Sequence, residues 1–339
     1  MKIDIHAHVL PRDLPDFNRE FGDTGFVSLE RYTNDGGEEK VRMMKDGKLF
    51  REVARNCYDT AERLSDLEIA NVDVQVLSTV PVMFHYWAKE DHALDTAKFL
   101  NDDLAKVVSG HPRRFLGLST VPLQNPKLAA RELERSTNKL GLSGVQIGSH
   151  IGDVNLDHQS LFPFYEAAED LGAAIMVHPW DMMGKETMKD YWLPWLVGMP
   201  AETTRAMCSM IFGGVLDQFP RLKVLFAHGG GAFAHTIGRI EHGFHVRPDL
   251  CQIRTKRSPR DYLGSFYVDS ITHDPKALMT NIDLFGLNSI ALGSDYPFPL
   301  GEAEAGKMIE GMGFSAEHRE RLFSGTALEW LSKSKEDFI

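Results

Sequence analysis

The chain has 339 residues, a length that suits one large α/β barrel or two ordinary domains. Its formal net charge is −11, from 37 basic and 48 acidic residues, and this acidity argues against nucleic acid or an anionic membrane as the main partner. The three cysteines lie far apart, and neither a signal peptide nor a membrane-spanning stretch is visible, so we expect a cytoplasmic protein.

Eight short apolar runs recur along the chain, separated by segments with helical periodicity. Most of the runs are apolar throughout rather than alternating, which is typical of parallel strands that are buried on both faces. The predicted strands are Lys2–Ile5, Val72–Leu77, Phe115–Thr120, Val145–Gly148, Ala174–Val177, Val224–Ala227, Phe266–Asp269 and Ile290–Gly293.

Amphipathic segments between these runs predict helices, and several carry a proline at the start or a glycine just past the end. The predicted helices are Asp91–Ser109, Pro126–Leu140, Gln159–Leu171, Ala201–Phe219 and Asp274–Phe285. Eight such repeats predict a TIM-like (β/α)8 barrel, with residues 1–339 forming a single domain. An open, doubly wound sheet is the alternative, although no G-x-G-x-x-G motif follows any predicted strand.

Two regions interrupt the alternation. Residues 9–60 separate the first two strands and contain a predicted hairpin, Val41–Met44 and Leu49–Val53, around an Asp-Gly turn. Residues 180–200 are rich in Trp, Met and Pro. Because both insertions follow strands, we expect them to lie over the C-terminal mouth, where barrel active sites are found. Residues 302–335 are predicted to form closing helices.

The strongest local signal is the H-x-H motif formed by His6 and His8 at the end of the first predicted strand. Side chains of a strand alternate between its faces, so both imidazoles should point into the barrel. A shared metal ion is one explanation for two inward histidines, and a pair of hydrogen-bonded histidines is the other.

Three more polar residues stand at the ends of predicted strands: His178 after the fifth, His228 after the sixth and Asp295 after the eighth. Each by itself could be a satisfied polar residue at a strand terminus. Together they should meet the H-x-H motif at one end of the barrel, since parallel strands end at the same rim. Nitrogen and oxygen ligands of this kind suit Zn²⁺, with Fe²⁺, Co²⁺ or Mn²⁺ as alternatives.

This arrangement resembles the amidohydrolase superfamily, which has H-x-H on strand one, histidines on strands five and six, and an aspartate on strand eight. Members with two metals usually bridge them through a modified lysine on strand four. The predicted fourth strand here, with the flanking Gly144 and Ser149, contains no lysine, which indicates a single metal. His228 can then act as an acid or base beside the metal; a fifth ligand or an orienting role are the alternatives.

A closer resemblance lies in three long segments, Leu77–Phe84, Tyr191–Thr204 and Ser294–Gly301. They are similar to the 2-amino-3-carboxymuconate-6-semialdehyde decarboxylase family, and the similarity runs essentially end to end. The resemblance implies one Zn²⁺ per subunit held by His6, His8, His178 and Asp295, and His228 as the general base.

The same resemblance implies which residues bind the small dicarboxylate substrate. Arg51 and Arg239 match arginines that grip its carboxylates, and Trp192 matches a tryptophan near it, although a packing role is the alternative for Trp192. The family's active form is a homodimer in which the residue matching Arg239 comes from the neighbouring subunit. Arg247 is expected to help the carboxylate site or the dimer contact.

The implied reaction is the non-oxidative decarboxylation of 2-amino-3-carboxymuconate 6-semialdehyde to 2-aminomuconate 6-semialdehyde, in kynurenine-type tryptophan degradation. We expect metal-bound hydroxide to add to the substrate before CO₂ leaves, with His228 moving the proton. A related aromatic acid decarboxylase, or a metal-dependent hydrolase using the same hydroxide, remains the alternative. A structural metal clip is a further one, although structural zinc sites are normally closed by four protein ligands.

Overall fold

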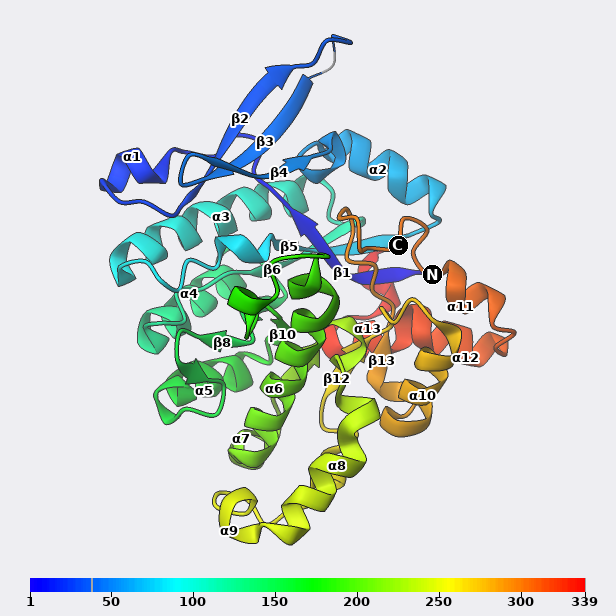
Figure 1. Cartoon of the computed structure of the whole chain (residues 1–339). Coiled ribbons are helices and arrows are strands. Elements are labelled where there is room, and N and C mark those ends of the chain that lie inside the picture. The colour runs from blue at the N-terminus through cyan, green and yellow to red at the C-terminus, as the bar shows by residue number, and fades with distance from the viewer. Residues whose placement is uncertain (38, 339) are drawn as a thin grey trace.

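The computed structural model describes residues 1–37 and 39–338. Its central feature is an eight-stranded sheet in which every neighbouring pair is parallel (Figure 1). The strands follow the chain order and match all eight predicted runs. They are β1 (Ile3–Val9), β5 (Val74–Thr79), β6 (Phe115–Ser119), β7 (Gly144–Gly148), β10 (Ala174–His178), β11 (Lys223–Phe226), β12 (Tyr267–Asp269) and β13 (Ile290–Ala291).

The sheet closes on itself through the segment that follows β13. Ala7 forms a parallel bridge with Tyr296, and the amide of Ile5 donates a hydrogen bond of 2.9 Å to the carbonyl of Leu292. The amide of Asp295 donates to the carbonyl of His6 at 2.8 Å. The prediction of a barrel is therefore confirmed, and the alternative of an open sheet is wrong.

Helices cover the outside of the barrel. They include α2 (Thr60–Ile69), α3 (Glu90–Gly110), α4 (Pro126–Asn138), α5 (Phe162–Leu171), α6 (Met199–Phe212), α8 (Phe233–Val246) and α10 (Pro275–Phe285). The helix predicted over 201–219 is broken, because Gly214 takes a left-handed φ of 70° before the short α7 (Val215–Gln218). Neither α2 nor α8 was predicted. None of the helices in the described part of the chain combines the length and apolar character needed to span a lipid bilayer.

The barrel interior is filled by apolar side chains from most of the strands, including Ile3 and Ile5 of β1, and by Trp330. Trp330 lies on α13 (Thr326–Leu331), and its indole N–H donates to the carbonyl of Lys223 at the start of β11, 3.0 Å away. The closing helices predicted at the C-terminal end are thus present. They also include α11 (Lys307–Gly311) and α12 (Ala316–Glu320).

A β-bulge in β1 sets the direction of the H-x-H motif. Asp4 pairs with Gln75 and His8 pairs with Ser78, so β1 holds one more residue than β5 over this stretch. The side chain of Asp4 points outward, where Gln75 donates to it and in turn accepts from Arg63 of α2. The extra residue reverses the alternation, which brings His6 and His8 to the inner face.

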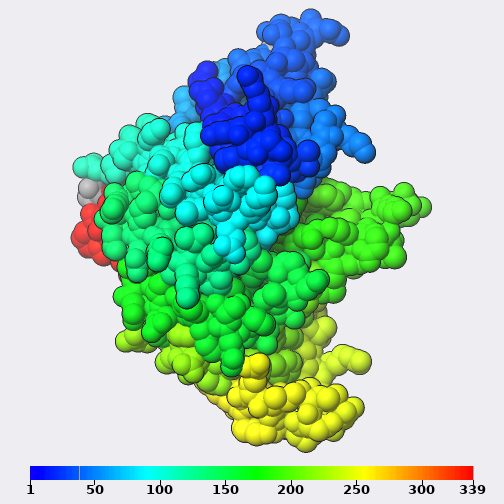
Figure 2. Space-filling model, turned by 90° about the vertical axis from the view of Figure 1, so that its left-hand side faces the viewer, coloured from blue at the N-terminus to red at the C-terminus, as the bar shows by residue number. Residues whose placement is uncertain are grey.

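The insertion between β1 and β5 forms a three-stranded antiparallel sheet of β2 (Val27–Thr33), β3 (Glu39–Lys45) and β4 (Lys48–Val53). The predicted hairpin is β3–β4, whereas β2 was not predicted. This sheet and the segment α8–α9, where α9 is Pro248–Cys251, project from opposite ends of the molecule (Figures 1 and 2). Other short elements include α1 (Phe17–Phe21) and a small hairpin of β8 (His150–Ile151) and β9 (Val154–Asn155).

Candidate active site

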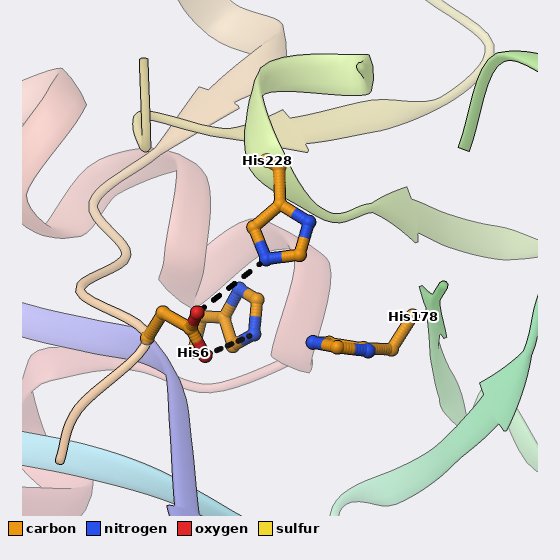
Figure 3. A group of neighbouring side chains, drawn as sticks. His6, His178 and His228 are labelled. Atoms are coloured by element: carbon orange, nitrogen blue, oxygen red, sulfur yellow. Dashed lines mark ion pairs between the residues drawn. The ribbon is translucent and has the colours of Figure 1, made fainter. Parts of the chain in front are cut away.

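Five polar side chains converge at the C-terminal mouth of the barrel. His6 and His8 lie on β1, and His178 is the last residue of β10. His228 comes two residues after the end of β11, and Asp295 four residues after the end of β13. Ligand atoms of His6, His178, His228 and Asp295 all lie within 4.8 Å of one another. Figure 3 shows the three rings turned toward a common centre. The rule that polar residues at strand ends meet at one rim is thus confirmed for all of them.

His8 joins the same cluster from the neighbouring position on β1. Its ring centroid lies 5.1 Å from that of His6 and 5.0 Å from that of His178. Its Nε2 atom is 3.1 Å from Oδ1 of Asp295, which also lies 3.5 Å from Nε2 of His6. Asp295 therefore contacts both histidines of the H-x-H motif.

The three histidines of β1 and β10 present their Nε2 atoms in the same way. Nδ1 of His6 donates to Oδ2 of Asp269 at 2.7 Å, Nδ1 of His8 to the carbonyl of Thr79 at 3.1 Å, and Nδ1 of His178 to the carbonyl of Pro179 at 2.9 Å. Carboxylates and carbonyls only accept, so the proton lies on each Nδ1. Each Nε2 is buried without a hydrogen-bond partner in the part of the chain that the structure describes. It therefore keeps its lone pair, which is the arrangement that metal-binding histidines require.

Burial and neighbouring groups set the protonation states of His8, His178 and Asp295. Burial lowers the pKa of His178 well below the ordinary value, and the neighbouring histidines add to this shift. Burial also lowers the pKa of His8, although the nearby carboxylate of Asp295 acts in the opposite direction. The pKa of His6 is raised instead, because burial, which alone would lower it, is outweighed by its contacts with Asp269 and Asp295. Burial alone would raise the pKa of Asp295, but its contacts with His228 and His8 hold that pKa well below the ordinary value. Neutral imidazoles and an ionised carboxylate are the forms that bind divalent ions.

His228 is held differently from the other three histidines. Its Nδ1 is buried and has no hydrogen-bond partner among the described residues, whereas its Nε2 lies 3.6 Å from Oδ2 of Asp295. Its backbone is in the left-handed region, with φ 55°, as is that of Asp295, with φ 56°. Such conformations cost on the order of 1 kcal/mol or more in a non-glycine residue and cluster at functional sites.

Two adjoining cavities, of about 40 and 250 Å³, open beside the cluster and share Trp195, Met199, Asp295 and Leu300. The smaller one is bounded by residues of both insertions, as their position after strands predicted. They include Met43, Phe50, Arg51, Trp180 and Trp192. The larger one is lined by His228, together with His235 of α8 and with Thr272 and His273 after β12.

Arg51 lines the smaller cavity. Its guanidinium lies 4.5 Å from the centroid of the Phe298 ring, and burial lowers its pKa, with Asp295 acting in the opposite direction. Within residues 1–37 and 39–338, no carboxylate forms an ion pair with it. A desolvated arginine without an anionic partner is suited to bind a carboxylate ligand.

The other residues expected at the substrate lie in different places. Trp192 lines the smaller cavity, with 39% of its surface exposed and with its ring centroid 5.9 Å from that of Trp195. Arg239 is exposed on α8 and lines neither cavity of its own chain. Arg247 follows α8, is exposed, and binds the carboxylate of Asp249 at 2.7 Å. A single chain therefore brings Arg51 and Trp192 to the cluster, but not Arg239 or Arg247.

Asp269 at the end of β12 is a site residue that the sequence analysis missed. It is completely buried and contacts both His6 and the backbone after β11. The available signal was the one used for His178 and Asp295, because Asp269 ends the seventh predicted strand. Burial alone would raise its pKa, but the hydrogen bond from His6 holds that pKa below the ordinary value.

Comparison with known proteins places this site in a family. A family model described as Amidohydrolase matches residues 3–333. Over 100% of this chain and 94% of the relative, the sequence is 52% identical to 2-amino-3-carboxymuconate-6-semialdehyde decarboxylase from Dictyostelium discoideum. The chain belongs to this decarboxylase family within the amidohydrolases. The enzyme of the same name from Caenorhabditis elegans is 41% identical over 97% of this chain and 94% of its own length.

Solved structures of other decarboxylases share the fold. The 5-carboxyvanillate decarboxylase from Novosphingobium aromaticivorans, complexed with manganese, has a TM-score of 0.81 at 22% identity, covering 98% of this chain and 96% of its own. The 5-carboxyvanillate decarboxylase from Sphingomonas paucimobilis has a TM-score of 0.77 at 27% identity, covering 82% of this chain and 85% of its own. Both are similar to this protein along most of the barrel.

Proposed function

We propose that this protein is a carboxy-lyase that converts 2-amino-3-carboxymuconate 6-semialdehyde to 2-aminomuconate 6-semialdehyde without an oxidant. The observation that carries the proposal is the position of the unpaired, half-buried Arg51 beside a cluster of three histidines with free Nε2 atoms. Such a site combines a place for a metal with a place for a carboxylate. The full-length identity of 52% to a decarboxylase of this substrate supports the choice of reaction.

His6, His8, His178 and Asp295 would hold one divalent metal per subunit, and we propose zinc. The fit rests on the three buried Nε2 atoms without partners and on the ionised carboxylate between them. Structural relatives bind manganese, which supports a divalent ion at this place in the fold. A divalent metal bound here would supply Lewis-acid chemistry, because such an ion lowers the pKa of a water molecule that it binds toward neutral pH.

His228 is the proposed proton carrier. Its Nε2 faces the cluster, and no acceptor among the described residues fixes a proton on its Nδ1, so the ring can accept a proton and return it later. This role agrees with its position in the wall of the larger cavity. Binding of the metal by His228 as an extra ligand is the alternative role.

The substrate carries two carboxylates, and Arg51 offers a planar pair of donors to one of them. The cavities of one chain contain no second arginine among the residues that the structure describes. We therefore propose a homodimer in which Arg239 of one subunit reaches the site of the other. Its exposed place on α8, outside both cavities of its own chain, supports donation across an interface. The cytoplasm is the proposed location of the dimer.

An aromatic acid decarboxylase is the second candidate. Gamma-resorcylate decarboxylase from a Polaromonas strain is 27% identical over 75% of this chain and 81% of its own length. Purified protein should be assayed with the semialdehyde and with gamma-resorcylate, by CO₂ release and loss of substrate absorbance. We expect CO₂ from the semialdehyde. Turnover of gamma-resorcylate alone would support the second candidate, and consumption of either substrate without CO₂ would indicate a hydrolase.

A further inference from the structure

The carboxylate of Asp269 joins two parts of the site that come from different strands. It is completely buried at the end of β12 and accepts four hydrogen bonds. Oδ2 accepts from Nδ1 of His6 at 2.7 Å and from the amide of His228 at 2.8 Å. Oδ1 accepts from the amides of Gly229 at 2.7 Å and Ile271 at 3.1 Å.

The turn that presents His228 needs such support. His228 and Gly229 have left-handed backbones in succession, with φ 55° and 61°. The amides of both residues point at Asp269, and the Asn281 side chain donates to the carbonyl of Gly229 at 2.9 Å from the other side. A left-handed backbone costs free energy in a non-glycine residue such as His228, and it persists only where the surrounding structure fixes it.

The same oxygen that holds this turn also fixes the ring of His6. Because Oδ2 accepts a hydrogen bond from the N–H at Nδ1, the proton of the ring stays on Nδ1 and the Nε2 lone pair of His6 faces the centre of the cluster. The corresponding partners of His8 and His178 are backbone carbonyls, with Oγ of Ser78 as a second contact of His8 at 3.3 Å, so His6 alone among these three depends on a carboxylate. One substitution can therefore disturb the metal ligand and the proton carrier together.

We propose that Asp269 is a positioning residue that sets the orientation of His6 and the turn of His228 with one carboxylate. The proposal rests on the metal site of the proposed function, but its test does not depend on which substrate the enzyme uses. It predicts that metal affinity and the geometry around His228 change together when Asp269 is altered.

Asp269→Asn is the direct test. An amide has one acceptor oxygen instead of two, so its NH₂ group would face two N–H donors that the carboxylate now accepts. We expect metal affinity, measured by competition with a chelator, to fall about 10- to 100-fold, which is typical of losing such a partner. The visible absorption of the Co²⁺-loaded protein should also change, because the ligand field around His6 changes. The value of kcat should fall with little change in KM, since Arg51 is untouched.

Glu132→Gln provides the matched control. Glu132 is another buried carboxylate, 2% exposed on α4, and its side-chain partners are Asn101 and Arg135. This variant should lose stability but keep the metal affinity and the Co²⁺ spectrum. Asp269→Asn with wild-type affinity and spectrum would overturn the proposal, whether or not the wild type decarboxylates the semialdehyde.

Asp269→Glu decides the question if the asparagine variant does not fold. It keeps both acceptor oxygens and the charge but shifts them by one methylene. We expect it to bind Co²⁺ with an altered spectrum and a lowered kcat. A Co²⁺ spectrum and kcat equal to those of the wild type would contradict a positioning role.

Discussion

The guanidinium of Arg51 lies over the ring of Phe298, 4.5 Å from its centroid, at the wall of the cavity beside the histidine cluster. The ring comes from the segment after β13, whereas the arginine comes from β4 of the inserted sheet. This contact ties the insertion to the barrel and holds the planar donor group in place without neutralising it, because an aromatic face attracts a cation but accepts no proton.

Arg51→Lys should raise KM for the semialdehyde and lower kcat/KM. A lysine keeps the charge but loses the two-pronged geometry and the flat stack on Phe298. The loss of a charge-assisted pair costs about 1.5–3 kcal/mol, which corresponds to roughly 10- to 150-fold in kcat/KM. Steady-state kinetics check this.

Arg42→Gln is the control for Arg51, because Arg42 lies on the same sheet but pairs with Glu52 at 3.0 Å on the exposed side. Its kinetics should equal those of the wild type. An Arg51→Met variant with an unchanged KM would show that the substrate carboxylate binds elsewhere.

His228→Ala should keep the metal and lose turnover. The four proposed ligands remain, whereas the proton carrier is removed, and such groups contribute about 10²- to 10⁴-fold to a rate. Elemental analysis of the purified variant and kcat for the semialdehyde are the measurements. His178→Ala is the comparison, since it removes a proposed ligand and should lose both metal and turnover. A metal-free His228→Ala protein would instead make His228 a ligand.

Much of this site was predictable because strand ends obey a simple rule. His178, His228 and Asp295 each follow an apolar run, and parallel strands end at one rim. The β-bulge in β1 was not predictable, since an H-x-H spacing puts both histidines on one face but cannot say which. That depends on the extra residue between Asp4 and Ala7, which only the pairing with β5 reveals.

Other features escaped prediction because their local signal is weak. Helix α8 contains Gly238 and Gly243 and several histidines, which lower helix propensity, so its apolar face is easily overlooked. Strand β2 alternates poorly, with Glu30 and Arg31 adjacent. The place of Asp269 at the mouth of the barrel could be predicted from the end of its strand, but its hydrogen bonds with His6 and with the turn of His228 depend on side-chain geometry that no sequence pattern gives.

Removal of the metal should abolish turnover and leave the fold intact. The barrel core is formed by apolar side chains from many strands, independent of the cluster, so circular dichroism should change little. The melting temperature should nevertheless fall, because a ligand at 100 times its Kd adds about 2.7 kcal/mol to the folded state. Chelation followed by re-addition of Zn²⁺ or Mn²⁺ tests both points. Unfolding on chelation would indicate a structural metal.

His85 should make the protein less stable in mild acid. It is buried against Phe26 and Trp87, and burial, with a smaller effect of Lys45, lowers its pKa to about 3. The unfolded chain has the ordinary pKa of about 6.5 and so binds more protons between these values. The contribution of the neutral, buried His85 to the free energy of unfolding is therefore fully present above pH 6.5. It is lost by about 1.4 kcal/mol per pH unit as the pH drops from 6.5 toward 3.

Urea unfolding of the wild type and of His85→Gln at pH 7 and pH 5 isolates this effect. We expect the glutamine variant to be less stable than the wild type at pH 7, because packing is lost. The difference between their free energies of unfolding should be smaller by about 2 kcal/mol at pH 5, since only the wild type loses stability through His85. An unchanged difference would mean that His85 titrates normally.

Mixing two inactive variants tests whether Arg239 acts across a dimer. Arg239→Ala lacks the proposed substrate contact, and His228→Ala lacks the proton carrier. In a mixed dimer, the subunit with an intact His228 receives Arg239 from its partner, so one of its two sites is complete. Random exchange gives about a quarter of all sites in this state, with activity in proportion.

The activity of the mixture shows whether Arg239 acts in the site of the partner subunit or in the site of its own chain. If Arg239 serves its own chain, every site lacks either the arginine or the histidine, and the mixture stays inactive. Arg247→Ala extends the question to Arg247, whose Nε and Nη2 both donate to the carboxylate of Asp249. Because Asp249 occupies the two-pronged face of its guanidinium, Arg247→Ala should retain most of the activity, and a large loss would assign Arg247 to the carboxylate site.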